Sequence, residues 1–363
     1  MQEKQTLALH GGAPVRGTFL PYAAQWIDED DIAAVVDVLK SPYLTTGPKV
    51  REFEEEFAAY VGAKYAVAVA NGTAALHAAA FAAEIRTGDE VITTPMTFAA
   101  SANCVLYQGG TPVFADIDPQ TYNIDPAEIK KKITAKTKAV IPVHYTGQPC
   151  DMEAINEIAK KHGLYVIEDA AHALGAEYKG RRVGGLSDMT IFSFHPVKHI
   201  TTGEGGMITT NNPELYDRLA QFRTHGITRD RAKMSRYEGP WYYEMQFLGY
   251  NYRLTEIQAA LGITQLAKCS RFIELRRKIV EMYNEGFRDL KELVIPYVKP
   301  GVSSAWHLYV IQLRTQNLTA GREELFTALQ KENIGVNVHY LPVYLHPYYQ
   351  GLGYEKGLCP GAE

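Results

Sequence analysis

Apolar and polar positions follow two different patterns along the first two thirds of the chain. Short, almost continuous apolar runs are separated by longer segments in which apolar residues recur at helical spacing. The short runs predict buried strands over residues 65–69, 90–95, 111–116, 139–143, 165–167, 189–192 and 207–210. The longer segments predict helices over residues 28–39, 50–61, 98–106, 125–133, 152–162, 213–223 and 255–287, with an alanine-rich helix opening after residue 70.

This alternation of strands and helices is typical of an α/β fold, in which helices cover both faces of a mostly parallel sheet. In such sheets ligands bind beyond the carboxyl ends of the strands. The loops that begin at Ala70, Thr94, His144, Glu168 and Ser193 all follow predicted strands. We therefore expect these loops to converge at one edge of the sheet.

The last third of the chain is organised differently. A long loop with charged and aromatic residues, 225–243, precedes the predicted helix 255–287, whose length suits a connection between two domains. Two strands with a helix between them are expected over residues 306–311, 322–332 and 335–339. We divide the chain into a large domain with an N-terminal arm, residues 1–265, and a smaller α+β domain, residues 266–363.

Composition narrows the class of protein. With 363 residues, of which 46% are apolar and 21% charged, the chain can bury a large core. A net charge of -4 gives no basic surface for nucleic acid. The uncharged runs 65–83 and 91–115 are too rich in polar residues, alanine or proline for membrane spans. Residues 1–5 show no secretory signal, and the four cysteines lack metal or disulfide spacing, so we expect a cytoplasmic protein without a metal.

The region 166–206 carries the most specific chemistry. One predicted strand ends at Asp169, and the next is followed by Ser193 and Lys198. These residues would suit a site for pyridoxal phosphate (PLP). The Asp169 carboxylate would pair with the pyridine nitrogen, Ser193 would face the phosphate, and Lys198 would form the Schiff base. The alternative is an ordinary strand-end acid and a surface lysine, the commoner situation of these residue types.

A second candidate feature is the turn 70–74, where Asn71, Gly72 and Thr73 lie between a predicted strand and a predicted helix. Small residues at such a turn expose the backbone N–H groups of the helix N-terminus, which can bind an anion. A turn that merely allows tight packing would explain the same residues. The turn lacks the G-x-G-x-x-G pattern, which disfavours a nicotinamide oxidoreductase.

Five motifs follow one another along the chain: ANGTAA at 70–75, EDAAH at 168–172, SFHPVK at 193–198, GEGG at 203–206 and GYNYRL at 249–254. With these motifs the chain resembles the DegT/DnrJ/EryC1/StrS family of PLP-dependent sugar aminotransferases, from about Leu20 to its end. The resemblance implies the aspartate-aminotransferase-like fold (PLP fold type I). It also implies PLP as cofactor, with pyridoxamine phosphate as intermediate, and a homodimer with shared active sites.

The resemblance assigns roles to residues of the first four motifs. It makes Lys198 the residue bonded to PLP and the base for proton transfer, and Asp169 the partner of the pyridine nitrogen. It implies that Thr73, Ala74 and Ser193 hold the phosphate.

Four further cofactor-binding residues are implied by position. Phe98 would stack on the cofactor ring, and His172 would lie near the cofactor hydroxyl. Asn251 and Arg253 would reach across the dimer interface toward the phosphate of the neighbouring site. Each of three residues has a structural alternative. Phe98 could be a core aromatic, His172 a buried histidine with satisfied hydrogen bonds, and Arg253 a member of a plain interface ion pair.

Within the family, the sequence most resembles the transaminases of pseudaminic acid biosynthesis. This implies transfer of the amino group of L-glutamate to C4 of a UDP-linked 2-acetamido-2,6-dideoxy-4-hexulose. Three stretches rich in aromatic and hydroxyl side chains suit a nucleotide sugar, namely 41–48, 239–244 and 338–344. Arg229, Arg231 or Arg236 could contact the diphosphate. Core packing and surface loops would account for the same aromatic residues.

Other activities remain open. They are amination of another nucleotide-linked 3- or 4-keto-6-deoxy sugar, a PLP-dependent sugar dehydratase, and a regulator that kept the fold without catalysis. Family dehydratases replace the lysine with histidine, whereas Lys198 is present here between His195 and His199. Lys198 and Asp169 are both present and no DNA-binding module is visible, which disfavours the regulator. Residues 358–363 end where family members usually continue, so the smaller domain is expected to be incomplete.

Overall fold

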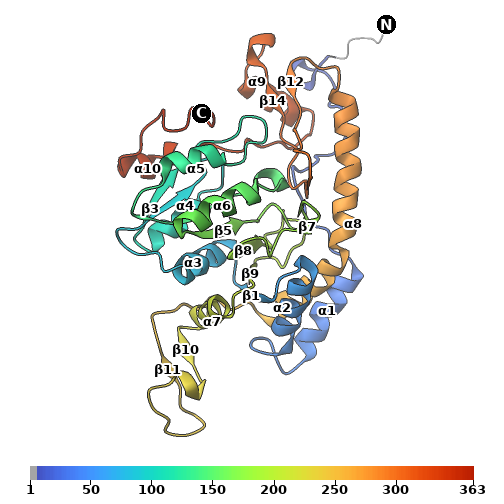
Figure 1. Ribbon diagram of the computed structural model, residues 1–363. Helices are drawn as coiled ribbons and strands as arrows, with labels where there is room; N and C mark the ends of the chain where they lie inside the picture. The colour runs from blue at the N-terminus through green and yellow to red at the C-terminus, as the bar shows by residue number, and fades with distance from the viewer. Residues whose placement is uncertain (1–5) are drawn as a thin grey trace.

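The computed structural model describes residues 6–363 (Figure 1). Residues 1–5, in which no secretory signal is expected, lie outside the described residues. A central sheet is flanked by helices, one long helix runs along one side of the molecule, and the short strands form small sheets that lie apart from one another (Figure 1). Among the described residues, no helix is long and apolar enough to cross a membrane.

The central sheet has seven strands in the order β1-β9-β8-β5-β4-β2-β3. The strands are β1 (Tyr65–Val69), β2 (Glu90–Thr93), β3 (Thr111–Phe114), β4 (Thr137–Ile141), β5 (Tyr165–Asp169), β8 (Met189–Ser193) and β9 (Gly206–Thr210). Only β9 is antiparallel to its neighbours, so the other six strands point in one direction. The mostly parallel sheet is confirmed, and the loops after β1, β2, β4, β5 and β8 leave from one edge.

The helices agree with the sequence pattern to within a few residues. They are α1 (Glu29–Lys40), α2 (Pro48–Val61), α3 (Gly72–Ala82), α4 (Ala100–Tyr107), α5 (Pro126–Lys132), α6 (Met152–His162), α7 (Pro213–Phe222), α8 (Glu256–Phe287), α9 (Arg322–Lys331) and α10 (Pro347–Gly351). Polar caps explain several starts: Asp28, Asn71 and Asn212 each accept a hydrogen bond from the first turn of α1, α3 and α7.

Both faces of the sheet are buried, as the continuous apolar runs require. In β1, Val67 and Val69 pack with the alanine-rich helix α3, while Ala66 and Ala68 point to the opposite face and pack with α2 and α8. Successive residues of a strand point to opposite faces, so a strand covered on both sides must be apolar throughout. The small residues of α3 let this helix lie close to the sheet.

Helix α8 joins the large sheet to the far end of the molecule (Figure 1). Thr255 and Gln258 form a capping box at its start. The buried carboxylate of Glu256 accepts hydrogen bonds from the backbone N–H groups of Lys49 (2.7 Å) and Val50 (3.3 Å) at the start of α2. The division of the chain after residue 265 stays a prediction; it falls within α8, which is continuous there.

The two strands expected over 306–311 and 335–339 are wrong. Trp306 has a φ of 52°, in the left-handed region, which interrupts any strand through it. Gly335 donates its N–H to the carbonyl of Leu20, so this segment pairs with the N-terminal arm. The described strands of the last third are short and lie elsewhere, at β12 (Leu293–Val294), β13 (Val302–Ser303) and β14 (Gln312–Leu313). Further two-residue strands occur earlier in the described chain, at β6 (Glu177–Tyr178), β7 (Arg181–Arg182), β10 (Ile227–Thr228) and β11 (Glu244–Met245).

The long loop expected over 225–243 is part of a hairpin built on β10 and β11. This hairpin extends away from the body of the molecule, below α7 (Figure 1). Its arginines contact tyrosines of the same hairpin: Arg229 lies over Tyr243, and the guanidinium of Arg231 lies 3.7 Å from the ring centroid of Tyr237.

Candidate active site

The turn after β1 forms a compact anion cradle against the end of β8. The side chain of Asn71 accepts a hydrogen bond from the N–H of Ala74 at 2.8 Å, which fixes the first turn of α3. A Cβ on Gly72 would lie 2.9 Å from the Cβ of Ser193, so only glycine allows this approach. The structure thus brings Thr73, Ala74 and Ser193 together at a helix N-terminus, where backbone N–H groups have no partner within the helix.

Asp169, the last residue of β5, is held by two hydrogen bonds. Its carboxylate accepts from the hydroxyl of Ser101 at 2.6 Å and from the N–H of Ala171 at 3.1 Å. The Ser101 hydroxyl also lies 2.7 Å from that of Thr97. Ser101 could not be recognised from the sequence, because a serine in an ordinary helix carries no signal of its own. The carboxylate is 5% exposed and fixed in direction, as a partner for a cationic ring nitrogen must be.

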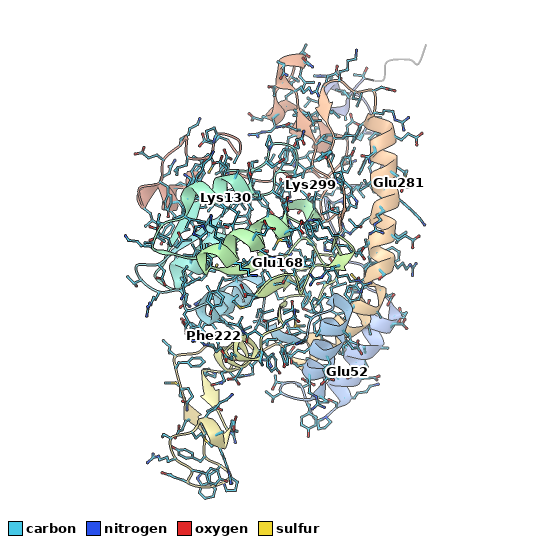
Figure 2. The ribbon with its side chains drawn as sticks, in the orientation of Figure 1. Glu52, Lys130, Glu168, Phe222, Glu281 and Lys299 are labelled. Carbon is cyan, nitrogen blue, oxygen red and sulfur yellow. The ribbon has the colours of Figure 1, made fainter. Side chains whose placement is uncertain are left out.

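The preceding residue, Glu168, anchors the same strand end from the other face of the sheet. It lies at the centre of the molecule (Figure 2) and is fully buried. It accepts hydrogen bonds from Ser187 (2.6 Å) and Thr190 (3.0 Å), and His144 Nε2 lies 2.9 Å away. Since the N–H of Cys150 donates to Nδ1 of His144, the proton of this imidazole is on Nε2, which donates to Glu168. The end of β5, and Asp169 with it, is therefore rigid.

Lys198 lies in the loop after β8 and is partly buried rather than a surface lysine. Burial lowers the pKa of its amine from 10.5 to about 8, while the negative charge of Asp169 acts in the opposite direction. At pH 7 roughly one such amine in ten is therefore neutral, far more than for an ordinary lysine. Only a neutral amine can act as a nucleophile or accept a proton.

His172 is 6% exposed, and its Nδ1 is buried with no hydrogen-bond partner. Its Nε2 lies 3.4 Å from the hydroxyl of Tyr340. Burial, with the nearby charge of Lys198, lowers the pKa of His172 well below its usual value, so the ring is neutral. A satisfied core histidine is thus excluded. An orphaned buried nitrogen beside Lys198 fits a polar ligand atom such as a cofactor hydroxyl.

Phe98 lies in the loop after β2, with its side chain 65% exposed. A core role is therefore excluded, and the ring is free to cover a ligand at the edge of the sheet.

Tyr252, which lies between Asn251 and Arg253, connects this segment to the turn after β1. The carbonyl of Tyr252 accepts a hydrogen bond from the N–H of Ala70 at 2.8 Å, and its hydroxyl lies 3.1 Å from Nδ1 of His77. Asn251 is exposed, and within residues 6–363 Arg253 makes no ion pair. The segment is held by Tyr252, while the side chains of Asn251 and Arg253 have no hydrogen-bond or ion-pair partner among the described residues.

The model of the DegT/DnrJ/EryC1/StrS aminotransferase family matches residues 25–363. The chain belongs to this family. It is 46% identical to the spore coat polysaccharide biosynthesis protein SpsC of Bacillus subtilis over 96% of this chain and 90% of that protein. It is 49% identical to the uncharacterized protein MJ1066 of Methanocaldococcus jannaschii over 96% of this chain and 91% of that one.

Solved structures agree with this assignment. PseC of Helicobacter pylori, an aminotransferase involved in the biosynthesis of pseudoaminic acid, has a TM-score of 0.85 and 35% identity, covering 92% of this chain and 88% of PseC. The PLP form of the putative sugar aminotransferase Spr1654 of Streptococcus pneumoniae has a TM-score of 0.87 and 33% identity. The match covers 95% of this chain and 90% of Spr1654. A form with pyridoxamine phosphate (PMP) also matches.

The protein is therefore a PLP-dependent sugar aminotransferase with the fold of PLP-dependent aminotransferases. The predicted family, fold class, enzyme class and cofactor are confirmed. The residues described above fit the cofactor: a helix N-terminus for a phosphate, a fixed carboxylate, an orphaned imidazole nitrogen and a lysine with a lowered pKa.

Proposed function

We propose that this aminotransferase transfers the amino group of L-glutamate to C4 of a UDP-linked 2-acetamido-2,6-dideoxy-4-hexulose, the reaction expected in pseudaminic acid biosynthesis. The transamination chemistry in this proposal is supported by one observation: Lys198, Asp169, Ser193 and the turn at Thr73 all lie at one edge of the sheet. The likeness to PseC, in fold and over nearly the whole chain, supports the choice of sugar.

In this proposal each residue of the chain has a defined task. Bound PLP would supply an electron sink for the carbon that loses a proton. Asp169 would hold a positive charge at the pyridine nitrogen, and its bonds to Ser101 and Ala171 keep the carboxylate aimed there. The N-terminus of α3, Thr73 and Ser193 would bind the phosphate.

Lys198 would hold the cofactor covalently through Nζ and, once displaced by the amino donor, move the proton at the reacting carbon. The lowered pKa of this amine makes the neutral form available as a base. His172, neutral because it is buried, would donate or accept a hydrogen bond at the cofactor hydroxyl without adding a charge beside Lys198. Phe98, exposed at the mouth of the site, would cover the ring and exclude water.

The sugar itself would be bound by segment 338–344, which reaches this edge of the sheet. Tyr340 lies beside His172, and the carbonyl of His339 accepts a hydrogen bond from Tyr145 at 2.6 Å. The other two aromatic stretches, 41–48 and 239–244, lie in the α1–α2 connection and in the projecting hairpin. A second subunit would be needed to bring the hairpin and its arginines to a sugar diphosphate.

We further propose a homodimer in which Asn251 and Arg253 complete the partner's site. The exposed Asn251 and the absence of an ion pair for Arg253 among the described residues support this role. Mixing inactive Lys198→Ala subunits with inactive Arg253→Ala subunits tests it, because a hybrid dimer contains one intact site. Recovery of roughly a quarter of wild-type activity is expected from random pairing of two subunit types; no recovery, with hybrids demonstrated by mass, would refute shared sites.

Another nucleotide-linked keto sugar is the second candidate. The chain is more similar to SpsC than to PseC, and DesI in the presence of its TDP-sugar product (TM-score 0.87, 32% identity) also matches. We also infer a cytoplasmic location, because all four cysteines are free and buried.

The decisive experiment offers purified enzyme and glutamate to UDP- and TDP-linked 4-keto and 3-keto sugars. Formation of 2-oxoglutarate together with a 4-amino UDP-sugar, located by NMR, is expected. Amination of only a TDP-sugar, or at C3, would replace the proposed substrate with the second candidate. Loss of a hydroxyl without 2-oxoglutarate would indicate a dehydratase. Lys198→Ala should abolish all turnover.

A further inference from the structure

The loop 304–308 has no role in the site described so far, yet several hydrogen bonds hold it to other parts of the molecule. The N–H of Ala305 donates to the carbonyl of Gly147 at 3.0 Å, and the N–H of Leu308 donates to the carbonyl of Thr146 at 3.2 Å. The carbonyl of Ala305 lies 3.0 Å from Nε2 of His199, the residue after Lys198 in sequence. The loop is thus fixed to the loops that follow β4 and β8.

Helix α8 holds the same loop from its other side. Nη1 of Arg276 donates to the carbonyls of both Trp306 (3.1 Å) and His307 (3.2 Å). Arg276 is partly buried, and burial lowers its pKa. A guanidinium that binds two consecutive carbonyls fixes the direction of the peptide between them.

The backbone in this region is strained. Trp306 has a φ of 52° and Thr146 a φ of 59°, and both side chains disfavour the left-handed region, Thr146 because it is β-branched. At Gly147, which has a φ of 108°, an added Cβ would lie 2.8 Å from both the carbonyl oxygen of His172 and the N–H nitrogen of Trp306. The two loops therefore meet at the backbone of His172.

This arrangement places the ring of His307 against the ring of His172. The two centroids are 4.4 Å apart with an interplanar angle of 35°, and His307 is 6% exposed. The centroids of the His307 and His199 rings are 5.5 Å apart. Tyr340 approaches His172 at Nε2 through its hydroxyl (3.4 Å), with the two ring planes nearly parallel (13°) and their centroids 6.4 Å apart. His172 therefore contacts two aromatic rings, of which His307 is the closer.

We infer that His307 is a positioning residue for His172: the strained, clamped loop exists to press its ring against His172, and so directs the orphaned nitrogen of His172 toward the cofactor hydroxyl. Removal of the His307 ring leaves a gap on one face of His172, which then rotates or moves. Hydrogen bonds that set the cofactor's electronic state depend on sub-ångström placement. The inference rests on the proposed role of His172 at the cofactor.

His307→Ala and His307→Phe, with Tyr309→Phe as control, test this role. The phenylalanine keeps a flat ring of similar size but has no nitrogen. Tyr309→Phe removes a hydrogen bond of the residue that follows the loop, from the Tyr309 hydroxyl to Asn284 (2.7 Å), without touching His172. The readouts are the visible absorption spectrum of bound PLP across pH, the dissociation constant for PLP, and kcat against KM for glutamate.

For His307→Ala we expect a displaced cofactor band, a roughly tenfold weaker affinity for PLP, and a kcat lowered about tenfold at an almost constant KM. His307→Phe should restore most of each value, and Tyr309→Phe should change none of them. A wild-type spectrum and affinity for His307→Ala would overturn the inference, as would a His307→Phe that behaves like His307→Ala.

Arg276→Gln covers the case in which His307→Ala does not fold. It leaves the ring of His307 in place but loosens its carbonyl clamp, so an intermediate displacement of the cofactor band is expected, and an unchanged band would overturn the inference. The proposed function is judged separately. Wild-type enzyme that binds PLP and forms 2-oxoglutarate from glutamate supports that function, whichever result the His307 variants give.

Discussion

The lowered pKa of Lys198 predicts how fast the cofactor-free enzyme captures PLP as pH changes. Capture requires the neutral amine, and burial brings its pKa from 10.5 to about 8. At pH 7 roughly one amine in ten is then neutral, against about one in 3,000 for an ordinary lysine, a gain of about 300-fold from the difference of the two pKa values.

Stopped-flow absorbance of the cofactor-free protein mixed with PLP measures the capture rate. The rate should rise nearly tenfold per pH unit below pH 8 and level off above it. A free primary alkylamine under the same conditions provides the control for the titrations of PLP itself, and Lys198→Ala should show no covalent phase. Asp169→Asn should move the midpoint lower, because the Asp169 charge stabilises the ammonium form.

A rate that keeps rising tenfold per unit between pH 9 and pH 10, after correction by the free amine, would refute this reasoning. It would mean that the Lys198 ammonium is well solvated in the cofactor-free protein. A midpoint that rises in Asp169→Asn would contradict the assigned direction of the electrostatic interaction.

Three further predictions concern the surroundings of the site. Ser101→Ala removes the 2.6 Å hydrogen bond to Asp169 and should lower kcat/KM by roughly 10- to 150-fold, since a hydrogen bond to a charged group contributes about 1.5–3 kcal/mol. Unchanged kinetics would show that the hydrogen bond from Ala171 is enough to orient the carboxylate. Gly72→Ala should weaken PLP binding at least roughly tenfold in a fluorescence titration without loss of secondary structure, because the new Cβ would clash with Ser193. Burial lowers the pKa of His199 to about 3, so the native state stays neutral while the unfolded state protonates. The free energy of unfolding should therefore fall as pH drops from 6.5 toward 3. When this free energy is measured by urea titration at several pH values, it should depend less steeply on pH in His199→Phe than in the wild type.

The large sheet and its site could be predicted from sequence because the signals are local. Each buried strand is a continuous apolar run, and each functional loop begins where a run ends. A carboxylate at the end of β5 and a lysine after β8 must then share one edge of the sheet. Gly72 and Ser193 could be placed together for the same reason.

The prediction of strands failed in the last third of the chain, where tertiary contacts override the local sequence pattern. The apolar run around Trp306 looks like a strand, but its backbone hydrogen bonds go to Thr146 and Gly147, which lie far away in sequence. Ser101 and His307 were likewise invisible, because their significance comes only from the ring or carboxylate beside them.

The anchoring of α8 by Glu256 has a mechanical consequence. A helix of 32 residues is about 48 Å long at 1.5 Å per residue. Glu256 fastens its first turn to α2, and side chains of α8 as far as Ile273 are buried in the core beside the sheet. The part from Glu274 to Phe287 extends about 21 Å beyond this core, and a tilt of about 5° there would move its far end by about 2 Å, by the arithmetic of a rigid rod. Arg276 lies one turn beyond Ile273, so the loop that supports His172 is bound close to the packed part of the helix.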